Sequence, residues 1–166
     1  DIVTPVPSCT LMFKQELPLM FSQDVDVQKV KIAMFDPFEY LMLRHRENKL
    51  KTDFKNPLGK IAYHVACHQR VQNIGLKTRD VLQLVQDTEV VPIERCSGHD
   101  GTYTVKSEFH EMAMKICRPV VNKVKQAEPD HYTSDCAMAA HHIESGLADG
   151  SKPEHPISLI RRAYGI

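Results

Sequence analysis

Three strand-length runs of apolar and β-branched residues, each closely followed by a cysteine, constrain the fold of this sequence more than any other feature. The runs and their cysteines are residues 60–65 with Cys67, 88–93 with Cys96, and 131–134 with Cys136. Runs of this length and composition are typical of β-strands. Helical patterns follow them over residues 78–86, 105–125 and 136–147. This alternation predicts an α/β fold, with a mainly parallel sheet and helices on both of its faces.

The three cysteines predict a metal site at the carboxyl ends of these strands. In open α/β sheets, ligand groups gather in the crevice at that edge, so residues far apart in sequence meet there. Thiolates are soft donors that hold iron or zinc. Cys67, Cys96 and Cys136 are therefore the candidate ligands, and the alternative is that they are small buried hydrophobic residues.

An imidazole would complete a tetrahedral site around three thiolates. His99, three residues after Cys96, is the first candidate, and His64 and His68 are the next. His141 lies five residues after Cys136 on the predicted helix and can approach the same crevice. Cys117 lies within the long apolar helix and is expected to be a packing residue.

Segments 64–68, 96–103 and 134–136 together resemble the cysteine-rich CCG domain. Such domains occur in cysteine-rich subunits of heterodisulfide reductase and of anaerobic glycerol-3-phosphate dehydrogenase, and in the iron-sulfur subunit of glycolate oxidase. The family pattern is one Cys, a long gap, Cys-Cys-Gly, a second long gap, and Cys-x-x-Cys. The resemblance covers about residues 58–166 and includes the final segment 155–160.

This sequence departs from the family pattern at two positions. Ser97 replaces the second Cys of Cys-Cys-Gly, and Ala139 replaces the last Cys of Cys-x-x-Cys, so three of the five thiols remain. Serine ligates iron weakly, and a nearby histidine can supply an imidazole instead.

The resemblance implies an iron-sulfur cluster or iron as cofactor, and an electron-transfer subunit or domain of a heterodisulfide reductase-like oxidoreductase. Its partner would be a flavin- or cluster-bearing subunit, with a quinone or a disulfide as electron acceptor. The loss of two thiols leaves open a structural zinc-binding scaffold without redox activity. Thiol chemistry at Cys96 without a metal is a third possibility.

We expect two domains, with the boundary at the polar connector that ends in residues 57–59. Residues 1–57 would be the end of an upstream CCG-like repeat plus connecting helices, and residues 58–166 the metal-binding domain. The segment from Asp1 to Cys9 resembles the segment from Asp130 to Cys136, since each has a strand, a turn and a cysteine before a helix. This similarity suggests an internal repeat, with Cys9 belonging to the first copy.

Several local signals predict where the helices begin and end. Ser8 is expected to cap a helix that Pro18 ends or kinks, and Thr78 to cap another. Residues 24–34 are expected to form a short surface helix. Asp36, Pro37 and Glu39 form a capping-box signature. Pro119 is expected to kink or divide the helix over 105–125.

Composition excludes several classes of protein. The chain of 166 residues has 42% hydrophobic residues, 25% charged residues and a formal net charge of zero, which argues against nucleic-acid or anionic-membrane partners. No apolar run approaches the roughly 20 residues that span a bilayer. Five cysteines without framework spacing favour metal or redox chemistry in a reducing compartment.

We therefore expect a cytoplasmic protein, associated with a membrane only through a partner. The first residues lack a signal-peptide pattern, and the chain begins without Met. We expect it to be the carboxyl portion of a longer polypeptide.

Overall fold

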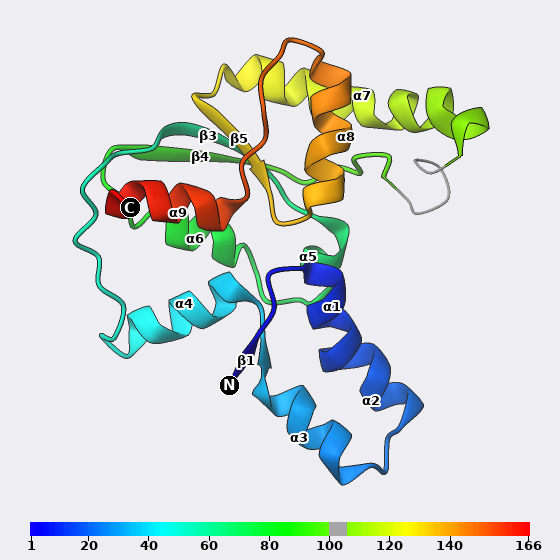
Figure 1. Cartoon of the computed structure of the whole chain (residues 1–166), viewed down its shortest axis with the longest axis vertical. Coiled ribbons are helices and arrows are strands. Elements are labelled where there is room, and N and C mark those ends of the chain that lie inside the picture. Colours follow the sequence, from blue (N-terminus) through cyan, green and yellow to red (C-terminus); the bar gives the residue numbers. More distant parts are fainter. Residues whose placement is uncertain (100–105) are drawn as a thin grey trace.

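The computed structural model describes residues 1–99 and 106–166. Its elements in chain order are β1 (Ile2–Val3), α1 (Pro7–Leu11), η1 (Met12–Glu16), α2 (Leu17–Met20), α3 (Val25–Ala33), β2 (Met34–Phe35), α4 (Pro37–Arg46), β3 (Gly59–His64), α5 (Cys67–Val71), α6 (Lys77–Leu82), β4 (Thr88–Ile93), η2 (Ser107–Phe109), α7 (His110–Ala127), β5 (His131–Ser134), α8 (Ala137–Leu147) and α9 (Pro156–Tyr164). Figure 1 shows their arrangement, with α7 and α8 on one side of the main sheet and α6 and α9 on the other.

The main sheet has the strand order β4-β3-β5, and both pairings are parallel. The predicted α/β fold and all three predicted strands are confirmed. β4 is an edge strand. The exposed Pro92 has no amide hydrogen to donate, which an edge strand tolerates because no further strand of the described residues pairs with it in the sheet. The central strand β3 is buried from Ile61 onward, as expected for a strand covered on both faces.

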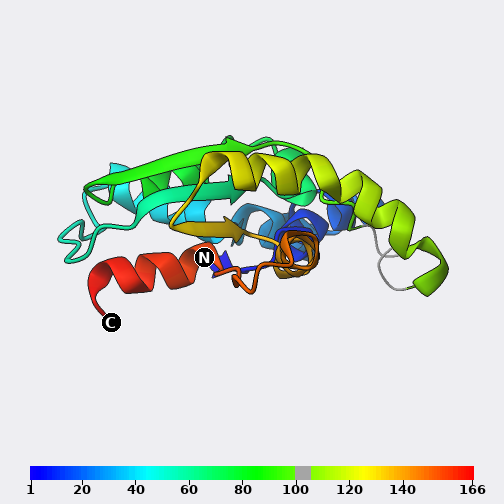
Figure 2. The ribbon, with the colours of Figure 1, turned by 90° about the horizontal axis from the view of Figure 1, so that it is seen from above.

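Alternate residues of β3 point into two separate cores. Ile61 and Tyr63 pack in one cluster with residues of α4, α6 and α9. Ala62 packs in the other cluster, with Cys117 and further residues of α7 and α8. Helices therefore cover both faces of the sheet, as the sequence predicts. In the view from above, α7 crosses close to the strands and α9 lies below them (Figure 2).

The helix α7 runs continuously through Pro119, so the expected division there is wrong. Pro119 is exposed, and the buried stripe of α7 lies on its other face, at residues such as Cys117, Val120 and Val124. The missing hydrogen bond of the proline therefore falls on the solvent side, where water can serve the free carbonyl. The expected start of this helix near Val105 lies outside the described residues.

The first helical segment differs from expectation in its N-cap, and it does not end at Pro18. Val6, not Ser8, is the N-cap of α1, and Pro7 occupies the first helical turn, which suits its fixed φ. The helical path continues through Pro18 to Met20, because the π-helical segment η1 precedes α2. In η1 the amide of Leu17 donates to the carbonyl of Met12, a wider turn that shifts the bonding pattern just before the proline.

The capping box at the start of α4 is confirmed. The carboxylate of Asp36 accepts hydrogen bonds from the amides of Phe38 at 2.9 Å and Glu39 at 3.4 Å, and the Glu39 side chain accepts from the Asp36 amide at 3.2 Å. The surface helix expected over 24–34 is also present as α3, capped by Asp24.

A strand, a parallel bridge and a proline-initiated helix occur twice in this order. In the first copy Val3 pairs with Phe35, and α4 begins two residues after Phe35. In the second copy Thr133 pairs with Glu154, and α9 begins two residues after Glu154. Both helices have proline in the first turn and a capping side chain before it, Asp36 in α4 and His155 in α9.

The region before the expected boundary at 57 contributes to the core of the region after it. Phe38 of α4 is fully buried, and Phe54 lies in the connector to β3. Both pack in the same cluster as Ile61 and Tyr63. By contrast, α3 has no buried residue, and α2 and α3 extend away from the sheet (Figure 1).

Candidate metal centre at the strand ends

The register of the sheet brings the three cysteine-bearing turns to one edge. His64, the last residue of β3, pairs with Ile93 of β4 on one side and Ser134 of β5 on the other. The strands therefore end on the same row of the sheet. Cys67 and Cys96 each follow that row by three residues, and Cys136 follows it by two. The topological premise of the predicted site is met.

The three thiols are not core residues. Cys67 is exposed on the first turn of α5, and the Arg70 guanidinium donates to its Sγ at 3.6 Å. Cys96 is exposed in the turn after β4, and the Gly98 amide donates to its Sγ at 3.4 Å. Cys136 is half-buried and is the N-cap of α8. The alternative that these three thiols are small buried hydrophobic residues therefore does not hold for Cys67 and Cys96, and Cys136 is only half-buried.

Cys117 behaves as predicted for a packing residue. It is fully buried between α7 and α8, and burial, with the nearby Cys96, raises the pKa of its thiol to about 11. Its proton therefore stays on at neutral pH, which makes Cys117 a poor ligand and nucleophile.

The ligands do not form a closed group in this structure. Within residues 1–99 and 106–166, no three His, Cys, Asp or Glu side chains are arranged to hold a metal ion. The strand ends bring the cysteines to one edge without bringing the sulfur atoms to ligand distance. Cys67, Cys96 and Cys136 as ligands of one metal remain a prediction.

His64 holds the strand ends together. It is buried, and its Nδ1 lies 3.0 Å from the Ser134 hydroxyl, while its Nε2 lies 2.9 Å from the Arg95 carbonyl oxygen. Burial lowers the pKa of His64 to about 4, so the ring is neutral at physiological pH. Since both ring nitrogens are engaged, His64 would have to give up a hydrogen bond to bind a metal.

The other two candidate histidines lie closer to solvent. His68 is exposed on α5, directly after Cys67. His99 is half-buried in the turn after Cys96, and its amide lies 3.4 Å from the Ser97 hydroxyl, to which it donates. Ser97 is itself buried, so its hydroxyl stabilises the turn in which the family pattern has a thiol.

The glycine of the Cys-Ser-Gly turn is required by close packing. Gly98 has a φ of +75°, and an added Cβ would lie 2.3 Å from the carbonyl oxygen of Ala113. The turn that carries Cys96 therefore rests directly on the backbone of α7. A side chain at this position would push Cys96 away from the sheet edge.

A buried carboxylate next to Cys136 was not predicted from the sequence. Asp135 accepts hydrogen bonds from Tyr63 at 2.6 Å and Thr78 at 2.8 Å. Burial raises the pKa of Asp135 to about 7. The hydrogen bond from Tyr63 lowers this pKa, and the charge of Asp36 raises it further. The only signal in the sequence is an acidic residue directly at a strand end.

Thr78 was expected to cap a helix, and this expectation is wrong. The N-cap of α6 is Leu76, and Thr78 lies inside the helix, fully buried. Its hydroxyl donates to Asp135, because a buried carboxylate needs hydrogen-bond donors.

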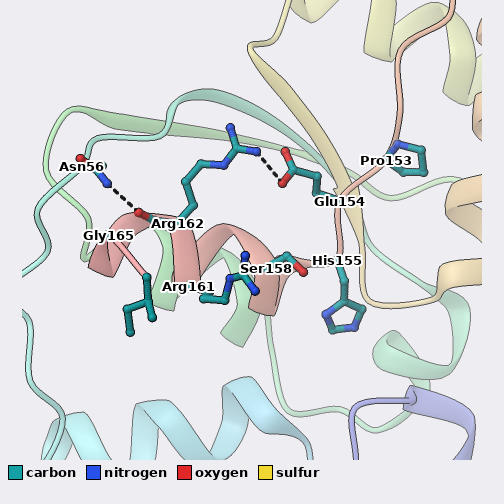
Figure 3. A pocket seen from close by; sticks show the side chains of 9 residues that line it. Asn56, Pro153, Glu154, His155, Ser158, Arg161, Arg162 and Gly165 are labelled. Carbon is teal, nitrogen blue, oxygen red and sulfur yellow. Dashed lines mark hydrogen bonds and ion pairs between the residues drawn. The ribbon is translucent and has the colours of Figure 1, made fainter.

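The surface depression beside α9 is distinct from this edge. Its volume is about 640 Å³, and none of the cysteines lines it. In Figure 3, the Arg162 guanidinium pairs with Glu154 at 2.8 Å, and the Asn56 amide donates to the Arg162 carbonyl at 2.9 Å. These contacts fasten α9 to neighbouring segments, so we interpret the depression as a structural contact region.

An open parallel α/β sheet with a cysteine turn after each of its three strands defines a cysteine-bearing α/β module. The sequence profile of the cysteine-rich CCG domain matches residues 61–144, which is just over half of the chain. The chain belongs to the CCG cysteine-rich domain family.

Two curated relatives share this similarity. Lactate utilization protein A of Anoxybacillus flavithermus is 29% identical over 142 residues, which cover 81% of this chain and 58% of the relative. Lactate utilization protein A of Lysinibacillus sphaericus is 30% identical over 135 residues, which cover 78% of this chain and 58% of the relative. The matched region thus spans less than two thirds of either relative.

Proposed function

We propose that this chain is an electron-transfer module of an oxidoreductase, and that Cys67, Cys96 and Cys136 bind its iron-sulfur or iron cofactor. The strand register carries the proposal, because it places a cysteine turn after each of three aligned strand ends. The donor set fits the cofactor, since thiolates are the usual ligands of iron in such centres. When bound, the cofactor would supply one-electron chemistry.

The protein's own residues would hold and shield this centre. The Gly98 amide and the Arg70 guanidinium already donate to two of the sulfur atoms. Hydrogen bonds to cluster sulfurs are among the features that tune a reduction potential. His64 would keep the strand ends, and with them the cysteine turns, in register.

The names of the relatives suggest the wider reaction. We propose that the module serves the oxidation of lactate or a similar 2-hydroxy acid, taking electrons from a flavin- or cluster-bearing subunit. A quinone or a disulfide would accept them. Among the described residues no helix has both the length and the apolar character needed to cross a membrane. We propose a cytoplasmic location, with any membrane association provided by a partner.

The repeated strand and helix order supports the proposed domain division. The first copy, from β1 to α4, would be the end of an upstream CCG-like repeat, and residues 58–166 the second domain. The burial of Phe38 and Phe54 in the second domain's core gives the two copies a shared packing surface.

Anaerobic reconstitution with iron and sulfide tests the function. The wild-type chain should gain visible charge-transfer absorption and a reducible paramagnetic signal. Cys96→Ser should lose both, whereas Cys9→Ser, which removes an exposed thiol outside the three strand ends, should keep them. A wild-type chain that gains neither signal would exclude the redox centre.

A structural zinc site is the second candidate function. It is favoured by Ser97 and Ala139, which reduce the family's five thiols to three, because three thiolates and one imidazole suit tetrahedral zinc. One equivalent of zinc without iron in the purified protein would support this alternative.

A further inference from the structure

One buried histidine of α8 has a ring nitrogen without a partner. His142 is 8% exposed, and its Nε2 has no hydrogen-bond partner within the described part of the chain. A buried nitrogen without a partner is costly, and a bound ion can supply the missing partner. The neighbouring His141 is different: it is exposed and lies 3.0 Å from Glu144.

His142 lies one helical turn beyond the position of a missing thiol. Ala139 stands where the family pattern ends in Cys, and His142 follows it by three residues, about 4.5 Å along the same helix face. Side chains of a helix lean toward its amino terminus. This tendency would direct the imidazole over the turn of Ala139, toward the end of α8 at which Cys136 is the N-cap.

The surroundings of His142 also connect it with the Cys96 turn. Burial lowers the pKa of His142. A hydrogen bond with the Ala113 backbone raises this pKa, and the nearby His99 and His110 lower it further. The Ala113 carbonyl is the group on which Gly98 rests, two residues after Cys96. His142 thus lies between the beginning of α8 and the turn that carries Cys96.

A hydrogen bond from α7 to the backbone of His142 holds this part of α8 against α7. The thiol of Cys117 donates to the His142 carbonyl at 3.9 Å, and Cys117 lies close enough to Cys96 to interact with it electrostatically. His142, Cys117 and the Cys96 turn therefore belong to one packed region between α7 and α8.

We propose that Nε2 of His142 takes the place of the thiol lost at position 139 and binds the same metal centre as Cys67, Cys96 and Cys136. This inference rests on the proposed metal centre. A neutral imidazole is the form that binds metal, and burial keeps the ring neutral. Replacement of a thiolate by an imidazole makes the ligand set less negative, which raises the reduction potential of an iron centre.

Cobalt(II) is a suitable probe, because its visible absorption and paramagnetism report tetrahedral sulfur and nitrogen ligands. The full chain would be titrated anaerobically as wild type, His142→Gln and the control His141→Gln. Loss of a metal ligand should weaken cobalt binding more than about 100-fold, beyond the roughly 10–100-fold cost of losing an outer hydrogen bond. His141→Gln should bind like wild type, because its side chain is exposed.

A second variant separates ligation from misfolding. His142→Gln combined with Ala139→Cys restores the family's Cys-x-x-Cys, and should recover tight binding with stronger sulfur-to-cobalt charge transfer. Nitrogen hyperfine coupling should be present in the wild type and lost in both His142 variants.

The outcomes distinguish the two proposals. The role of His142 would be overturned if the wild type binds cobalt and His142→Gln binds it with the same affinity and the same nitrogen coupling. The proposed metal centre would then still stand. A wild-type chain that binds neither cobalt nor reconstituted iron would overturn both.

Discussion

Tyr63 donates a hydrogen bond of 2.6 Å to the carboxylate of Asp135, and both side chains are buried. Tyr63 lies on the central strand, and Asp135 directly precedes Cys136. The bond therefore fastens a cysteine turn to the middle of the sheet. Thr78 donates to the other carboxylate oxygen, which ties α6 to the same point.

The titration of Asp135 should make the stability of the metal-free protein depend on pH. Burial raises its pKa to about 7, from an ordinary value near 4. Between these values the folded protein keeps a proton that the unfolded chain has released. Folding takes up a proton there, so the contribution of Asp135 to the free energy of unfolding falls as pH rises from 4 to 7.

Asp135→Asn should remove this dependence. Relative to wild type, the variant should gain up to about 4 kcal/mol of unfolding free energy between pH 4 and pH 8, at about 1.36 kcal/mol per pKa unit. Urea unfolding at several pH values measures it, with the exposed Asp53→Asn as control. If wild type and Asp135→Asn differ in unfolding free energy by the same amount at pH 4 and pH 8, Asp135 is ionised throughout this range.

His64 should act in the opposite direction. Its pKa is lowered to about 4 from an ordinary value near 6.5, so protonation favours the unfolded chain as pH falls below 6.5. In wild type the two slopes oppose each other between pH 4 and 6.5. Once Asp135 is replaced, the slope from His64 should emerge as a stability that rises with pH over that range. A double variant with His64→Gln should have a smaller slope there, and His142, whose pKa is also lowered by burial, should account for part of what is left.

Tyr63→Phe should destabilise the protein more at pH 8 than at pH 5. At pH 8 Asp135 is ionised, and a hydrogen bond to a charged group contributes about 1.5–3 kcal/mol, against about 1 kcal/mol for a neutral one. The same urea experiment measures the loss. Tyr132→Phe is the matched control, because its hydroxyl makes only a 3.4 Å contact with the Ser151 carbonyl. Equal losses at the two pH values would contradict the ionisation of Asp135.

Gly98→Ala should distort the Cys96 turn. The positive φ alone costs a non-glycine residue about 1–2 kcal/mol, and contact with the Ala113 carbonyl should add about 1–3 kcal/mol. Gly150→Ala isolates the first cost, because Gly150 has a φ of +83° and no atom within 4 Å of an added Cβ. Thermal unfolding should show the larger loss at position 98, together with weaker metal binding; equal losses would mean that the turn can move away from α7.

Alkylation should separate the cysteines by location. In the metal-free protein, iodoacetamide at neutral pH should modify the exposed Cys9, Cys67 and Cys96 quickly, and Cys117 only after unfolding. A bound metal should protect Cys67, Cys96 and Cys136, and leave Cys9 reactive. Mass spectrometry of peptides measures each site, and protection of Cys9 as well would contradict a centre confined to the strand ends.

The positions of the cysteines relative to the sheet could be predicted from sequence, because each strand is a local run whose length and composition are visible. The start of α4 could be predicted for the same reason, since Asp36 and Glu39 lie within one turn. The roles of Thr78 and Asp135 could not. They are 57 residues apart, and only the packed sheet makes the carboxylate buried and the hydroxyl its donor.

At Pro18 and Pro119 the sequence left open an end or division of the helix and a kink, and the structure excludes the end and the division. Proline removes one donor, and the cost depends on what surrounds the freed carbonyl. A π-helical turn precedes Pro18, and Pro119 faces solvent, so neither helix ends. Likewise, the sequence drew attention to His141, whereas the ligand that we propose is the adjacent His142, whose burial the sequence does not reveal.

The parallel order β4-β3-β5 sets a sequence of events during synthesis of the protein. Each parallel neighbour of β3 arrives only after a helical crossover, and β5 arrives 70 residues after β3, where His64 meets Ser134. Contacts of such long range form late in folding. A ribosome must therefore release the residues of β5 before the third cysteine turn can join the sheet edge, so the proposed centre could be assembled only after this last strand has been made.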